Sequence, residues 1–149
     1  MPEPLPLVRV CSLLNAANAR YLIIGGHACI LHGLIRTTED VDLLIEPTEE
    51  NCQRVITALA QLQDGAAAEL QPRDLLENVV VKIADEIAVD VSTQAWKVTY
   101  QDALPTAMEI VVDEVRIPYL GLDSLIASKE TYREQDRADL LWLRNLRRE

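Results

Sequence analysis

Phenylalanine is absent from the sequence, and aromatic residues as a whole make up only 4% of it. Such a chain offers few flat side chains on which the bases of single-stranded nucleic acid could stack. A hydrophobic core must therefore come from its many Leu, Ile, Val and Ala residues. With 49% hydrophobic and 26% charged residues, the composition is that of an ordinary globular protein rather than of a disordered chain.

Cysteine is scarce and follows no pattern. Cys11, Cys29 and Cys52 are an odd number and lack CxxC or Cys/His ligand spacing. The sequence therefore predicts neither a disulfide framework nor a zinc site, and reduced, buried thiols are the expected state.

Long apolar runs are also missing. None approaches the roughly 20 residues that a membrane-spanning helix needs, and residues 1–4 do not begin a secretion signal. We therefore expect a cytoplasmic protein without a membrane partner.

Positive charge is in deficit, with 14 Lys and Arg against 24 Asp and Glu and a formal net charge of -10. This balance disfavours strong non-specific binding to nucleic acid or to anionic lipid. One basic cluster remains near the end of the chain, and it is more typical of a last helical turn that complements the helix dipole than of a binding patch. It consists of Arg137, Arg144, Arg147 and Arg148.

Apolar periodicity predicts a mixed α/β chain with helices at both ends. A length of 149 residues fits a single domain, because two separate cores would each be marginal. We expect its core over about residues 20–118 and a C-terminal helical segment over about 122–147. The expected helices are 7–19, 27–32, 48–62, 96–104, 122–132 and 136–146. The expected strands are 21–24, 40–45, 79–84, 87–91, 108–112 and 115–117.

Three aspartates stand out within the expected strands. Asp40 and Asp42 are two positions apart, which places both carboxylates on one face of the sheet and turns Val41 into the core. Such a pair is tolerated if it is exposed, if one carboxylate is protonated, or if a divalent cation sits between them. Asp90 is a lone carboxylate in the apolar run 87–91. Three such carboxylates on neighbouring strands could hold two Mg²⁺ or Mn²⁺ ions, as nucleotidyl transfer requires.

A glycine pair separates the strand 21–24 from the helix that follows. Gly25 and Gly26 would let the backbone approach a phosphate group, and the start of a helix offers free N–H donors. A plain tight turn is the alternative interpretation of the same two residues.

Taken together, these segments resemble the nucleotidyltransferase superfamily, and in particular its AbiEii-type branch, which includes bacterial toxin and abortive-infection proteins. The matching residues are Gly25-Gly26-His27-Ala28, Gly33, Arg36-Thr37-Thr38, Asp40-Val41-Asp42-Leu43-Leu44 and the helical set Lys129, Arg133, Asp136 and Asp139. Two features depart from the pattern. Gly26 stands where minimal nucleotidyltransferases carry serine, and the larger C-terminal region of many toxins is missing.

The resemblance implies a nucleotidyltransferase fold of the α/β (α+β) class, with a mixed, mostly antiparallel sheet flanked by helices. It also implies that Asp40 and Asp42 bind metal and that Asp90 activates an acceptor hydroxyl. The nucleotide contacts that it implies come from Gly25, Gly26, Arg36, Thr38 and Lys129.

Several of these residues have structural alternatives. Arg36 could pair with Asp40 or Glu39 in its own loop. The helical set from Lys129 to Asp139 could form an ion-pair ladder on a solvated face. Packing in the core or at an interface is the expected role of His27, His32, Trp96 and Trp142.

Two functions remain open from the sequence. The first is an enzyme that moves a nucleoside monophosphate from ATP or another NTP to a hydroxyl of a protein, RNA or small molecule, in a toxin–antitoxin or phage-defence setting. The second is an inactive or weakly active binding module, such as an antitoxin, a regulatory subunit or a nucleotide sensor, that works with a protein partner.

Overall fold

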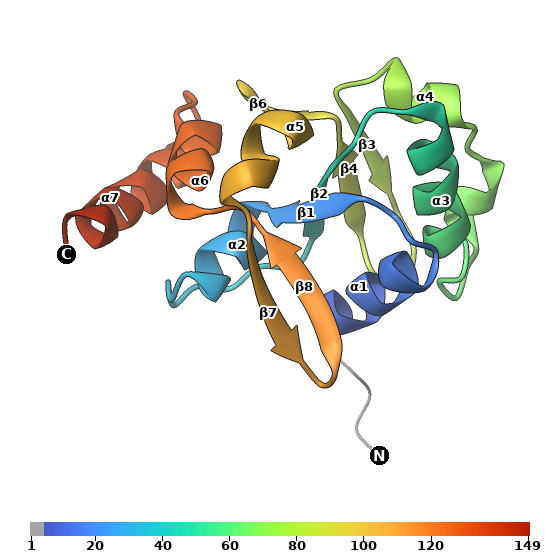
Figure 1. The fold of residues 1–149 in the computed structure, drawn as a ribbon, viewed down its shortest axis with the longest axis horizontal. Helices are drawn as coiled ribbons and strands as arrows, with labels where there is room; N and C mark the ends of the chain where they lie inside the picture. Colours follow the sequence, from blue (N-terminus) through green and yellow to red (C-terminus); the bar gives the residue numbers. More distant parts are fainter. Residues whose placement is uncertain (1–4) are drawn as a thin grey trace.

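Six strands pair into one mixed sheet at the centre of the computed structural model, which describes residues 5–149 and leaves residues 1–4 outside (Figure 1). A separate hairpin contributes two short strands. The strands of the main sheet are β1 (Tyr21–Ile24), β2 (Val41–Ile45), β3 (Val80–Ile83), β4 (Val89–Ser92), β7 (Met108–Val112) and β8 (Val115–Tyr119). Those of the hairpin are β5 (Gln94–Ala95) and β6 (Val98–Thr99).

Seven helices are found in residues 5–149, together with short 3₁₀ turns. They are α1 (Pro6–Ala16), α2 (Gly25–Leu31), α3 (Glu49–Leu59), α4 (Pro72–Leu76), α5 (Tyr100–Ala103), α6 (Leu122–Lys129) and α7 (Glu134–Arg148). Helix α1 packs on β8 and α3, whereas α2 packs on β1 and β2 and touches α6. The last two helices, α6 and α7, lie together at the left of Figure 1.

The main sheet has the strand order β3-β4-β2-β1-β8-β7. Pairing is antiparallel for β1 with β2, β3 with β4, and β7 with β8, and parallel for β2 with β4 and β1 with β8. The expectation of a mixed, mostly antiparallel sheet flanked by helices is therefore confirmed. Strands β1 and β2 lie in the middle and are almost completely buried, because every residue but one in these runs is apolar.

Two sequence expectations need correction. The predicted helix 96–104 is wrong in its first half, because Trp96 has a φ of 58° and turns the β5–β6 hairpin. Helix α5 begins only at Tyr100, after the Thr99 side chain accepts a hydrogen bond from the Asp102 N–H. The second correction concerns Asp40, which lies in a bend before β2 rather than within the strand.

The basic residues at the end of the chain make ion pairs. Arg144 lies 3.2 Å from Glu130 and Arg147 lies 3.4 Å from Asp123. Among residues 5–149, no helix combines the length and the apolar character needed to cross a bilayer.

A buried amide fixes the position of α3 against the central strands. The Asn51 side chain accepts a hydrogen bond from the Arg20 N–H at 2.7 Å and donates to the carbonyls of Arg20 and Glu46 at 2.9 and 3.0 Å. Only 2% of Asn51 is exposed. One side chain therefore bonds to backbone groups just before β1 and just after β2, and it links α3 to the end of this strand pair.

We expect Asn51→Leu to destabilise the protein by about 3 kcal/mol, because it leaves buried backbone groups without partners. Urea unfolding at neutral pH would measure this change. Gln53→Leu is the matched control, since Gln53 is exposed on the same helix and should alter stability by less than about 0.5 kcal/mol. Equal effects of the two substitutions would contradict the assigned role of Asn51.

Candidate functional site

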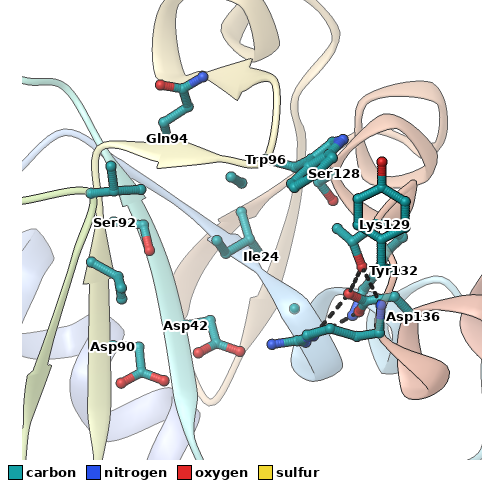
Figure 2. A pocket seen from close by; sticks show the side chains of 16 residues that line it. Ile24, Asp42, Asp90, Ser92, Gln94, Trp96, Ser128, Lys129, Tyr132 and Asp136 are labelled. Carbon is teal, nitrogen blue, oxygen red and sulfur yellow. Dashed lines mark hydrogen bonds and ion pairs between the residues drawn. The ribbon is translucent and has the colours of Figure 1, made fainter.

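Two carboxylates lie side by side in the middle of the sheet. Asp42 in β2 and Asp90 in β4 are direct partners across a parallel strand pair. Each is the one partly exposed residue of its strand, and the flanking Val41, Leu43 and Val89 are fully buried. The alternation of each strand thus turns both carboxylates to the same face, where Figure 2 shows them adjacent. The expected proximity of Asp90 to the first acidic segment is present.

The environment of Asp42 disfavours its charge. Burial raises the pKa of Asp42 to about 7, and the neighbouring carboxylates of Asp90 and Asp40 add to this rise. The ammonium group of Lys129 acts in the opposite direction. Asp90 Oδ1 is buried and has no hydrogen-bond partner among residues 5–149, although the Lys82 ammonium lies within ion-pair distance of it.

Lys82 faces the same carboxylates from the next strand. It pairs with Asp90 across β3 and β4, and its Nζ lies 3.2 Å from Asp40 Oδ2 and 4.0 Å from Asp90 Oδ1. The sequence analysis missed Lys82, although a single charged residue in the apolar β3 run was a signal of the same kind as Asp90 in β4. Asp40 thus forms an ion pair with Lys82 at the outer side of the Asp42–Asp90 pair, and 36% of the Asp40 side chain is exposed.

The glycine pair is required by close packing against this site. Gly25 has a φ of 69°, and a Cβ there would overlap the Asp42 carboxylate. At Gly26, a Cβ would lie 2.7 Å from Thr38 Oγ1. Both glycines therefore allow the backbone after β1 to lie directly on the side chains of the segment that leads into β2.

Lys129 lies beneath the site in a buried ionic network. Its Nζ is 3.3 Å from Asp136 and 3.0 Å from Asp139, and all three residues are at most 5% exposed. Arg36 reaches Asp139 at 2.7 Å across 103 positions of sequence. Arg36 therefore pairs with neither Asp40 nor Glu39, the partners considered from the sequence. The alternative of a solvated ion-pair ladder fails for Lys129, Asp136 and Asp139, which are buried.

Asp136 remains ionised in this network. Burial alone would raise the pKa of Asp136, but hydrogen bonds from Thr131 and Arg133 and the charge of Lys129 hold it below its usual range. The Arg133 Nε donates to Asp136 at 2.9 Å. The network joins the segment before β2 to α6 and α7, so these segments are fixed relative to each other.

Two cavities meet at the carboxylate pair. One, of about 430 Å³, is polar, and the other, of about 500 Å³, opens on the opposite side toward β5 and the α6–α7 connection. Both are lined by Gly25, Asp42, Asp90, Lys129 and Arg133. The polar cavity brings together all eight residues that the sequence singled out, namely Gly25, Gly26, Arg36, Thr38, Asp40, Asp42, Asp90 and Lys129.

The fit of the site to a divalent cation rests on two carboxylates. Among residues 5–149, no three His, Cys, Asp or Glu side chains are arranged as a group that could hold a metal ion. Asp42 and Asp90 nevertheless offer adjacent oxygens, one of them unsatisfied, at the floor of the polar cavity. This set fits Mg²⁺, which is commonly held by one or two carboxylates and completed by substrate phosphates and water.

The two histidines differ: His32 has a structural role, whereas the buried Nε2 of His27 has no hydrogen-bond partner among residues 5–149. His32 Nε2 lies 2.8 Å from the Leu120 carbonyl, and its ring contacts Tyr119 edge to face. Burial and the charge of Arg36 lower the pKa of His27. Neutral His27 thus adds no positive charge beside Arg36. Of the two roles expected for Trp96, core or interface packing, the structure rules out the core, because Trp96 is 42% exposed and lines the second cavity.

Comparison with solved structures identifies the fold. The chain is similar to an antigenic nucleotidyltransferase-like protein from Paracoccidioides brasiliensis, with 18% identity, a TM-score of 0.59 and coverage of 94% of this chain and 74% of that one. It is also similar to a candidate nucleotidyltransferase from Thermotoga maritima, with 13% identity, a TM-score of 0.57 and coverage of 92% and 89%. No family model and no curated protein matches the chain. The fold is nucleotidyltransferase-like, as the sequence resemblance implied.

We expect Asp42→Asn to stabilise the metal-free protein. The unfolded chain releases the Asp42 proton near pH 4, whereas the folded protein retains it to about pH 7, so stability falls as pH rises between these values. Asn cannot ionise. The gain in free energy of unfolding that Asp42→Asn gives over the wild type should therefore grow from pH 5.5 to pH 8 and reach about 2 kcal/mol. Urea unfolding in EDTA would test this, and a pH-independent effect would show that Asp42 ionises without penalty.

Proposed function

We propose that this protein is a divalent-metal-dependent nucleotidyltransferase, which moves a nucleoside monophosphate from an NTP to a hydroxyl group. The observation that carries the proposal is the Asp42–Asp90 pair at the junction of two cavities, in a nucleotidyltransferase-like fold. An adjacent buried carboxylate pair is costly to the fold, and its position against Gly25 gives it a chemical rather than a structural use.

The polar cavity fits the triphosphate of the substrate. Its positive side chains are Arg36, Lys129 and Arg133, and the backbone at Gly25 and Gly26 is free of side chains that would keep a phosphate away. The same cavity is lined by the acidic Glu39, Asp40, Asp42 and Asp90. A bare triphosphate would be repelled by these carboxylates, so the cavity favours the magnesium complex of an NTP.

The proposed reaction is displacement at the α-phosphorus. The acceptor oxygen forms a bond to this phosphorus, the bond to the bridging oxygen breaks, and pyrophosphate leaves with the electron pair. The Asp90 carboxylate takes the proton of the acceptor hydroxyl, and Asp42 would help to hold the divalent cation beside the α-phosphate. Arg36 and Lys129 balance the charge on the leaving pyrophosphate. Mg²⁺, when bound by Asp42, Asp90 and, in this proposal, Asp40, supplies Lewis-acid stabilisation of the phosphate oxygens.

The setting of the reaction follows from the sequence resemblance. Similarity to the AbiEii-type branch favours a toxin–antitoxin or phage-defence role, with a protein, RNA or small-molecule acceptor and a possible protein partner. Cys11, Cys29 and Cys52 are all free and buried, which supports a reducing compartment such as the cytoplasm.

A nucleotide-binding module without turnover is the second candidate. One observation in its favour is the ion pair of Lys82 with Asp40, which occupies the third carboxylate. Another is that Asp136 and Asp139 already neutralise the charge of Lys129. Both candidates require binding of a magnesium–NTP complex, which would raise the melting temperature. The module differs from the enzyme in transferring no label.

Transfer should depend on the position of the label and on Asp90. We expect label from the α-phosphorus of one NTP, but not from its γ-phosphorus, to appear on an acceptor in a cell lysate with Mg²⁺. Asp90→Asn should lower this rate by about 100-fold or more, because it removes the proton acceptor. Autoradiography of protein and RNA fractions would measure transfer.

Asp113→Asn is the matched control for that experiment. Asp113 is exposed at the β7–β8 turn with a φ of 50°, a conformation that Asn adopts as readily as Asp. The rate of label transfer by Asp113→Asn should equal that of the wild type. Melting temperature shifts by an NTP without any transfer of α-label would favour the binding module, and neither binding nor transfer would reject both functions.

A further inference from the structure

An aromatic pair borders the second cavity. Trp96 lies in the turn between β5 and β6, and Tyr132 lies between α6 and α7. Their ring centroids are 6.0 Å apart and the rings are perpendicular. Figure 2 shows the two side chains close together. Both residues are exposed, at 42% and 84%. Two large aromatic residues from distant parts of a chain poor in aromatics thus meet at one opening.

The backbone at Trp96 is unfavourable for a bulky residue. Trp96 has a φ of 58° in the first position of a two-residue hairpin turn, where glycine is the usual choice. Lys97 follows it without a positive φ. The turn therefore carries conformational strain, and the strain presents an indole to the cavity rather than to the core.

The rest of the second cavity matches a flat, uncharged heterocycle. Ile24, Val79, Val80 and Ala95 supply apolar surface, and Ser92 and Ser128 add hydroxyl groups. Its volume of about 500 Å³ lies within the range of small-molecule sites. The polar cavity shares its charged residues at the carboxylate pair with the second cavity, but no aliphatic or aromatic side chain of residues 5–149 lines it. A nucleotide has the same division, with charged phosphates at one end and a base at the other.

We propose that the second cavity is the base subsite of the nucleotide, and that the base stacks on the indole of Trp96. The proposal rests on the proposed function, because it assigns the phosphates to the polar cavity and the reacting α-phosphate to the Asp42–Asp90 junction. Tyr132 is a positioning residue, which holds the indole by an edge contact. Stacking recognises every base by its flat face, so the Trp96 indole itself admits any of the four NTPs.

Calorimetry with two ligands separates the base from the phosphates. Wild type, Trp96→Ala and Trp96→Phe would be titrated with each NTP and with inorganic tripolyphosphate, all in Mg²⁺. We expect Trp96→Ala to bind the preferred NTP about tenfold more weakly, a loss typical of one stacked base, and to bind tripolyphosphate as the wild type does. Trp96→Phe keeps a ring and should retain most of the affinity. The exposure of Trp96 makes both variants compatible with folding.

Fluorescence gives a second readout with Trp96 intact. The chain has 2 tryptophans, so Trp142→Phe leaves Trp96 as the single indole, and Trp142 lies beside Gly33, away from the aromatic pair. The preferred NTP should quench this fluorescence in a saturable way, and tripolyphosphate should leave it unchanged. In the same background, Tyr132→Ala should reduce the quenching at saturation, whereas Tyr132→Phe should preserve it.

The outcomes distinguish the subsite from the function. If the wild type binds the NTP no more tightly than tripolyphosphate, or if Trp96→Ala weakens both ligands equally, the base subsite is rejected while nucleotide binding stands. If the wild type binds neither ligand, the proposed function fails and the subsite fails with it. An unquenched Trp96 at saturating NTP also rejects stacking on the indole.

Discussion

The structure depends on one unfavourable arrangement, the placement of two carboxylates directly opposite each other in adjacent parallel strands. Asp42 and Asp90 are surrounded by buried aliphatic residues in the middle of the sheet, where the low local polarity magnifies their repulsion. The result is a raised pKa for Asp42 and a buried Asp90 oxygen that receives no hydrogen bond from residues 5–149. A cation relieves both conditions at once, which is the physical reason for assigning chemistry to this position rather than stability.

The surroundings of the pair are organised to keep it accessible and rigid. Gly25 removes the side chain that would cover Asp42, so the backbone leaves an open approach. Beneath, Lys129 is clamped between Asp136 and Asp139, and Arg36 ties Asp139 to the segment before β2. Buried charges that are fully paired contribute more to a unique geometry than to net stability. The network therefore sets the spacing between the sheet and the C-terminal helices, and with it the width of both cavities.

The two cavities differ in chemistry in the way that the two ends of a nucleotide differ. The polar side gathers glycines, hydroxyls and cations, whereas the other side gathers aliphatic residues and the Trp96–Tyr132 pair. They share the Asp42–Asp90 floor, so a molecule lying across both would place its middle at the carboxylates. Under the proposed function, this arrangement would link the carboxylate pair to selection of a substrate, and the exposed, strained Trp96 would contact the base.

By itself, the sequence determined the local elements and the chemical character of the site. Strand 21–24 was predicted with its observed bounds, and Asp42 and Asp90 were recognisable as lone charges in apolar strands, because periodicity and hydropathy act over a few residues. Only the tertiary structure decided which strands distant in sequence are neighbours, that Arg36 pairs with Asp139, and that Lys82 joins the carboxylates. It also decided that Trp96 turns a hairpin rather than opening a helix. These outcomes depend on contacts between distant segments, whose energies no local pattern of residues encodes.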